Sequence, residues 1–215
     1  MSILVLAEHE HEELNPLVLK TVAAAKEIGG DIHMLVAGSG CQAVADACTK
    51  IDGVAKVLLA DNAALEHGLA ENLAPLLAEL GKSYSHILAT ATTFGKDVLP
   101  RAAALLDVGQ ISDIISVESA DTFVRPIYAG NILATVQSSD AIKVITVRAT
   151  AFDAVAAEGG SAAVENVSGG DDAGLARFVE KQETESERPE LTGARVVISG
   201  GRGMGSGANF KLLEG

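Results

Sequence analysis

Short apolar runs alternate with stretches of helical periodicity through the first half of the chain. Four runs have the length of strands: Ile3–Ala7, 32–38, Lys56–Ala60 and His86–Thr90. Helical patterns follow them at 15–28, Cys41–Ile51, up to Gly81 and at Asp97–Leu106. Strands that are apolar on both faces belong inside a parallel sheet that right-handed crossovers cover with helices on each side. The pattern predicts an α/β fold with a doubly wound, mostly parallel, nucleotide-binding-like sheet.

The alternation stops near Asp107, and a β-rich segment follows. ISDIISVE, TFVRPIYAGNILATVQ and KVITVR read as three or four strands, so we expect Ile111–Val147 to pack on the parallel sheet or to extend it. Pro126 has no N–H to donate to a ladder. We therefore expect its strand to be an edge or bulged strand.

A glutamate-rich stretch marks a change of domain. Glu180–Glu190 carries five Glu against one Lys and one Arg, which is typical of an exposed linker. The apolar run Val196–Ile198 beyond it is expected to begin a second domain. The predicted division is therefore 1–190, an α/β domain with the linker at its end, and 191–215, the start of a second α/β domain.

The overall charge and hydropathy limit the possible partners and compartments. The formal net charge of −13 opposes polyanion binding, which needs clustered Lys and Arg, so nucleic acid is not an expected partner. No apolar run reaches the ~18 residues of a membrane span, so direct membrane insertion is not expected either. Met1 is followed almost at once by a strand, which predicts a chain without a targeting peptide and a bacterial cytoplasmic location.

Two features could suggest a metal or redox centre. EHEHEE at Glu8–Glu13 combines His9 and His11 with four carboxylates, but the histidines lack the i, i+4 spacing of a helical zinc pair, which favours a solvated loop. Cys41 and Cys48 lie seven apart, a spacing that suits neither a CxxC redox pair nor a zinc knuckle. They are expected to be buried free thiols.

Two loops follow expected strands, where open α/β sheets bind their ligands. AGSG at Ala37–Gly40 could cradle a phosphate, but two glycines also suit a tight turn, which we favour. Thr92, Thr93 and Lys96 could bind an anion. The alternative is that Thr93 or Asp97 caps the next helix while Lys96 stays solvated, and the sequence does not decide between the two.

The glycine-rich tract near the end of the chain is the sharpest signal. Val196–Ile198 leads into SGGRGMGSGA, and Ala208–Leu213 resembles the first turns of a helix. Strand, glycine loop and helix in this order open a nucleotide-binding βαβ unit, in which backbone N–H groups face anionic oxygens. Arg202 adds a permanent charge that can pair with a phosphate or lie against a flavin. Arg202, beside Gly201, is therefore the first candidate for a cofactor contact.

Longer motifs give the chain a family resemblance. LVLAEH, KTVAAAKEIGG, FGKDVLPRAAALLDVGQISDI, TFVRPIYAGNILATVQS, KVITVR and RPELTGARVVISGGRG occur in order, and together they closely resemble the alpha subunit of electron-transfer flavoprotein. The resemblance spans essentially the whole chain.

The resemblance implies an electron carrier rather than an enzyme. This carrier is a heterodimer whose carboxy-terminal alpha domain holds FAD against a beta subunit, and the beta subunit carries AMP. The family takes electrons from acyl-CoA dehydrogenases of fatty acid oxidation and related enzymes and delivers them to a membrane quinone oxidoreductase. Arg202 of SGGRG is the flavin contact that the resemblance transfers to this sequence, with Gly201 next to it.

The resemblance also sets an expectation about the end of the chain. Most family contacts to FAD come from the segment that would follow Gly215, so the second domain is expected to be incomplete here. Three alternatives stay open: an NAD- or ATP-binding enzyme, an assembly module that binds the beta subunit without a cofactor, and a mitochondrial matrix location for a processed chain.

The linker prediction is testable by limited proteolysis. Because residues 180–190 are dense in charge and end next to Pro189, we expect the first cuts there. Mass spectrometry of the early fragments would locate these cuts. Preferential cutting within 18–28, an expected buried helix, would contradict the domain boundary.

Overall fold

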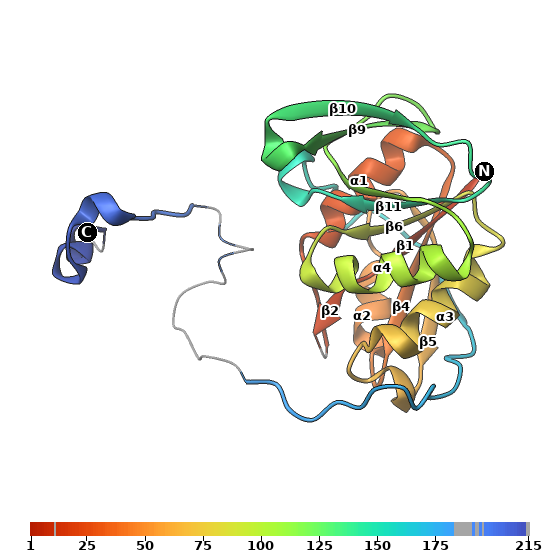
Figure 1. Ribbon diagram of the computed structural model, residues 1–215. Helices are drawn as coiled ribbons and strands as arrows, with labels where there is room; N and C mark the ends of the chain where they lie inside the picture. Colours follow the sequence, from red (N-terminus) through yellow and green to blue (C-terminus); the bar gives the residue numbers. More distant parts are fainter. Residues whose placement is uncertain (11, 183–190, 192–193, 195, 214–215) are drawn as a thin grey trace. The chain divides into compact units, whose positions relative to one another are not determined.

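The computed structural model describes residues 1–10, 12–182, 191, 194 and 196–213. The chain divides into two units, Met1–Val179 and Glu180–Gly215 (Figure 1). Most of the predicted linker lies outside the described residues, so the division between residues 190 and 191 stays a prediction. Each unit is described separately below.

A parallel sheet forms the centre of the first unit. Within the described residues it has seven strands in the order β12-β5-β4-β1-β6-β11-β7. Their bounds are β1 Ser2–Leu6, β4 Asp31–Gly38, β5 Val54–Asp61, β6 His86–Thr90, β7 Gln110–Ile114, β11 Lys143–Val147 and β12 Ala163–Asn166. All neighbouring pairs are parallel, so the predicted mostly parallel α/β sheet is confirmed.

Helices cover both faces of this sheet. α1 (Val18–Ile28) and α2 (Gln42–Cys48) pack on one face, and α3 (Ala70–Gly81) and α4 (Thr93–Leu105) pack on the other. Along β1 the side chains alternate between the two cores: Ile3 and Val5 face α1, whereas Leu4 and Leu6 face α3 and α4. This alternation follows from the two-residue period of a strand.

Three helices differ from the predicted bounds. α1 begins at Val18 rather than at residue 15. α4 begins at Thr93 rather than Asp97, because Thr92 serves as its N-cap. α2 ends at Cys48 rather than Ile51. Short 3₁₀ turns lie at Ala63–Leu65, Tyr128–Gly130 and Ala149–Ala151.

The β-rich segment both extends the parallel sheet and packs on it. β7 and β11 join the sheet, whereas β8 (Ser116–Val117), β9 (Thr122–Ile127) and β10 (Ile132–Gln137) form a separate antiparallel sheet. The Phe123 side chain of β9 is fully buried in the core on the α1 side. A two-stranded ribbon, β2 (His9–Glu10) with β3 (Glu13–Leu14), completes the unit.

The prediction of an edge strand at Pro126 is wrong, because β9 is the middle strand in the order β10-β9-β8. The carbonyl of Val124 accepts a hydrogen bond from the N–H of Ile115 at 2.8 Å. Backbone groups alternate along a strand, so the nitrogen of Pro126 faces the same side as Val124. β8 pairs with residues 123 and 124 and ends before Pro126, so the missing N–H interrupts no ladder.

The second unit lacks the predicted strand and α-helix among its described residues. Val196–Ile198 is not a strand, and the turns that follow are 3₁₀ helices at Arg202–Met204 and Gly207–Leu213. The three apolar side chains at 196–198 are 53–71% exposed. A strand needs a neighbour to satisfy its backbone groups, and the described part of this unit provides none.

Gly95 allows α4 to lie close to β6. A Cβ built on Gly95 would lie 2.0 Å from the carbonyl oxygen of Thr90, much closer than any real Cβ contact. A side chain at this position would therefore push the helix off the sheet.

We expect Gly95→Ala to destabilise the protein strongly. Its cost should be about 3 kcal/mol, the upper end of overpacking penalties, which corresponds to roughly 6–12 °C in Tm for a chain of this size. Gly207→Ala is the control, because nothing lies within 4 Å of a Cβ built there. Equal Tm values for the two variants in thermal denaturation would contradict the close approach.

Candidate functional site

The carboxyl ends of β1 and β6 form the place where this fold would bind a ligand. From β1 the chain proceeds to β4 and β5 on one side, and β6 returns to the other side of β1. Open α/β sheets bind ligands in the crevice at such a reversal of strand order. In this chain Glu8 follows β1 and Thr92 follows β6.

A carboxylate of the chain itself lies at this reversal. The Thr92 hydroxyl donates to Glu8 Oε2 at 2.6 Å and accepts from the N–H of Gly95 at 3.2 Å. Burial raises the pKa of Glu8, and hydrogen bonds from Thr92 and Asn15 partly oppose that rise. Glu8 thus binds at the start of α4, where an anionic ligand would otherwise be expected.

The predicted anion-binding group after β6 is not assembled. Thr92 is committed to Glu8 and to the α4 cap. Thr93 and Lys96 are exposed. Of the predicted alternative, the cap from Thr93 or Asp97 is wrong, because Thr92 is in the extended conformation that an N-cap requires. The exposure of Lys96 agrees with that alternative.

The loop Ala37–Gly40 is a tight turn rather than an open phosphate cradle. The N–H of Gly40 donates to Asp61 Oδ1 at 2.8 Å, and His9 Nε2 donates to the carbonyl of Ala37 at 3.0 Å. A Cβ on Gly38 would lie 2.8 Å from His9 Cε1. The loop is therefore filled by the side chains of His9 and Asp61.

The two cysteines and the EHEHEE stretch are the remaining sequence features that could suggest a metal or redox centre. Cys41 and Cys48 are free and buried, as predicted, and burial raises the pKa of Cys48 to about 12. His11 of EHEHEE lies outside the described residues. Among the residues that are described, no three or more His, Cys, Asp and Glu side chains are grouped to hold a metal ion.

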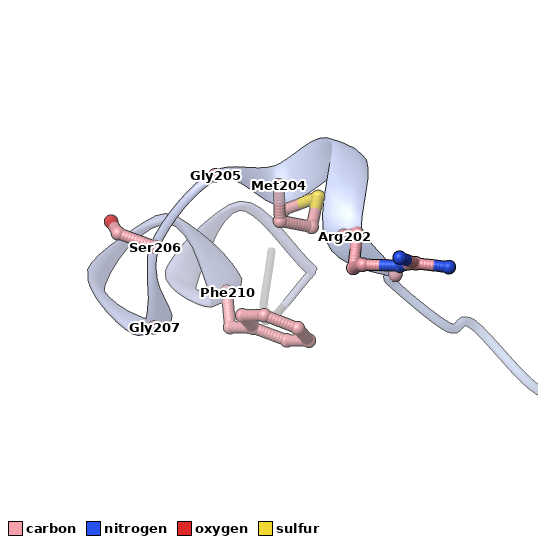
Figure 2. A pocket seen from close by; sticks show the side chains of 7 residues that line it. Arg202, Met204, Gly205, Ser206, Gly207 and Phe210 are labelled. Atoms are coloured by element: carbon pink, nitrogen blue, oxygen red, sulfur yellow. The ribbon is translucent and has the colours of Figure 1, made fainter.

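A shallow pocket lies at the glycine-rich tract of the second unit (Figure 2). Its volume is about 350 Å³, and its lining comprises Gly201, Arg202, Met204, Gly205, Ser206, Gly207 and Phe210. The N–H of Met204 donates to the carbonyl of Gly201 at 3.0 Å, and the N–H of Gly205 donates to that of Arg202 at 3.1 Å. These bonds form the 3₁₀ turn that carries Arg202.

The two residues predicted to contact a cofactor both line this pocket. The side chain of Arg202 is exposed and extends away from the other labelled residues in Figure 2. Within the part of the chain that the structure describes, no side chain pairs with its guanidinium. Nothing lies within 4 Å of a Cβ built on Gly201, Gly203 or Gly207, so the backbone there is open to close approach by a ligand.

Residues 3–172 match the family model described as electron transfer flavoprotein domain. The chain belongs to the electron transfer flavoprotein family. The matched residues lie within the first unit, so this match rests on the parallel sheet and its helices and does not include the glycine-rich tract.

Three relatives illustrate how far the similarity to this family extends. The chain is 67% identical over 213 residues to the electron transfer flavoprotein subunit alpha of Pseudomonas aeruginosa, covering 99% of this chain and 69% of the relative. It is 49% identical to the Paracoccus denitrificans subunit alpha, covering 100% of this chain and 69% of the relative. For the mitochondrial subunit alpha of Dictyostelium discoideum the identity is 49%, covering 98% and 64%.

These alignments confirm the predicted resemblance to the alpha subunit of this family. The chain spans about two thirds of the length of these relatives. Among the described residues, no helix has the length and hydropathy that crossing a membrane requires.

The half-buried carboxylate of Glu8 makes a testable contribution to stability. Because burial raises its pKa above 4.5, the folded state binds the proton more tightly than the unfolded chain does. Its favourable contribution is complete below pH 4.5 and is lost as the pH rises through the folded-state pKa. Glu8→Gln keeps an acceptor for Thr92 but has no charge to desolvate.

We therefore expect Glu8→Gln to be more stable than the wild type at pH 7.5, with the difference shrinking as the pH falls toward 4.5. Urea denaturation at several pH values measures this difference. Glu12→Gln, an exposed neighbour, is the control and should follow the wild type throughout. A Glu8→Gln variant that is less stable at pH 7.5 would show that the charge itself is needed.

Proposed function

We propose that the chain acts as the alpha subunit of a heterodimeric, FAD-containing electron carrier. The observation that carries the proposal is the 67% identity to a subunit alpha over 99% of the chain. Such a carrier turns over no metabolite of its own. When FAD is bound it supplies the redox chemistry, and the chain's residues bind and orient it.

Arg202 and Gly201 are the proposed cofactor contacts. A guanidinium without a partner among the described residues can pair with a phosphate or lie against a flavin. The open backbone at Gly201 permits close approach. A pocket of about 350 Å³ is at the lower end of the range for ligand sites, so these residues fit one part of FAD. We propose that its other contacts come from the part of the relatives' length that this chain does not cover.

We further propose that the AMP of the complex binds to the beta subunit and not to the first unit. Glu8 at the start of α4 and Asp61 on the N–H of Gly40 already place carboxylates where a nucleotide would bind its phosphates. The same contacts oppose the alternative of an NAD- or ATP-binding enzyme. They favour a first unit that serves as a scaffold.

The electron partners are proposed from the family resemblance. Acyl-CoA and related dehydrogenases would reduce the carrier, and a membrane quinone oxidoreductase would oxidise it. The proposed location is the bacterial cytoplasm, with the mitochondrial matrix as the alternative, since relatives of both origins are similar to the chain.

The absorption spectrum of the purified complex tests the proposed function. The full-length alpha subunit that contains this sequence would be isolated with its beta subunit, and a flavin spectrum is expected. A complex with a bound nucleotide but no flavin would favour a nucleotide-binding enzyme. A complex with neither would favour an assembly module.

We expect Arg202→Ala to weaken FAD binding by the full-length complex. A hydrogen bond from Arg to a charged group contributes about 1.5–3 kcal/mol, equivalent to ~10- to 100-fold in Kd. Titration with FAD, followed by flavin fluorescence, measures this change. Arg177→Ala is the matched control, because Arg177 is also exposed and lies outside the pocket.

The same titration on the 215-residue chain tests where the rest of the pocket lies. We expect little FAD to bind, and Arg202→Ala to change that little. Tight, stoichiometric binding of FAD by this chain alone would contradict the proposal that most contacts lie elsewhere.

A further inference from the structure

Three exposed apolar side chains of the first unit lie on the β9–β10 hairpin. Tyr128 is 77% exposed, Ile132 50% and Leu133 61%. In Figure 1, β9 and β10 lie above α1 and β11. Clustered apolar exposure on a folded domain is typical of an interaction site.

The two strands of this hairpin have one buried face and one open face. Val136 pairs with Phe123, and both contact the core on the α1 side. The alternate residues of β10 (Leu133, Thr135 and Gln137) are exposed, and they pair with Pro126, Val124 and Thr122 of β9. These six residues of the open face are uncharged. At one end of the face the carboxylate of Asp121, just before β9, accepts hydrogen bonds from Thr122 at 2.7 Å and Gln137 at 2.9 Å.

The single charged residue of the two strands belongs to the other face. Arg125 pairs with Ala134 rather than with an open-face residue, and its Nε donates to the carbonyl of Ser112 in β7 at 2.8 Å. This bond fastens the hairpin to the edge of the parallel sheet. It also keeps the guanidinium of Arg125 off the open face.

β10 has a free edge along this face. Among the described strands it pairs with β9 alone. Because the carbonyl of Val124 points to the β8 side, the alternation of backbone groups directs those of Leu133, Thr135 and Gln137 away from β9. Exposed edges are commonly protected by charged residues, Pro or bulges, and ILATVQ contains none of these.

The tip of the hairpin has an unusual backbone. Tyr128 and Ala129 have φ of 49° and 55°, a left-handed conformation that is uncommon for residues other than glycine. Such conformations gather at functional sites. Here the turn holds a tyrosine in solvent, and tyrosine is enriched among the residues that dominate binding energy at interfaces.

We propose that the open face and free edge of β9–β10, here called the hairpin surface, bind the beta subunit, with a strand of that subunit added along β10. The choice of partner rests on charge. A second copy would bring another −13 chain against the first, and like charge opposes that association. This cost is inherent to a second copy, whereas the charge of a different chain is independent of this sequence. This inference rests on the proposed function, which supplies the beta subunit as partner.

Calorimetric titration of the chain with purified beta subunit from the same organism tests the proposal. Leu133→Lys places a charge on the open face, and Thr135→Pro removes an N–H directed to the free edge without removing a bond to β9. Each variant should raise Kd at least 10-fold. Leu105→Lys is the matched control, since Leu105 is 55% exposed at the end of α4, and its Kd should equal that of the wild type.

The possible results separate this proposal from the proposed function. If Leu133→Lys and Thr135→Pro bind like the wild type, the hairpin surface is wrong and the beta-subunit partnership stands. If the wild-type chain does not bind the beta subunit, the partnership fails and this inference fails with it. If sedimentation shows a dimer of this chain that Leu133→Lys abolishes while beta-subunit binding is unchanged, the occupant is a second copy and the proposal is overturned. Tm values of all variants within a few degrees of the wild type confirm that folding is intact.

Discussion

Burial of the parallel sheet on both faces is the constraint on which the first unit depends. Its inner strands carry apolar side chains in both directions, so neither face can remain in water. Ile3 and Val5 require α1 on one side, and Leu4 and Leu6 require α3 and α4 on the other. Gly95 lets α4 approach β6 closely, and that approach brings Thr92 to Glu8.

This arrangement has a consequence for function. The reversal of strand order would normally create a ligand crevice, but here the chain's own carboxylates lie at the strand ends. Glu8 binds Thr92 at the start of α4, and Asp61 binds the N–H of Gly40. These contacts support the proposal that the first unit serves as a scaffold. The candidate for cofactor contact moves to the second unit, where the guanidinium of Arg202 has no partner among the described residues.

The β-rich segment has one face that packs on the core and one face that is exposed. Phe123 joins the main core, and Arg125 fastens β9 to β7. These contacts hold a hairpin whose strands place no charged residue on the other face and whose outer strand, β10, has one free edge among the described strands. Stable anchoring of one face therefore leaves the opposite face available for another chain.

The sequence by itself determined the class of fold, the extent of the β-rich segment, the burial of both cysteines and the family. Periodicity is a local property, and it persists in the fold because tertiary packing requires the same apolar faces. Arg202 and Gly201 remain sequence-based candidates for FAD contact.

Only the tertiary structure decided which strands became neighbours and which polar groups met. Thr92 lies 84 residues from Glu8, so no local pattern could pair them. β9 lies between β8 and β10 because it pairs with both of them. Among the described residues, Val196–Ile198 is not a strand, because the described part of its unit provides no strand to pair with. Strand pairing is a non-local interaction, and propensity along the chain does not specify it.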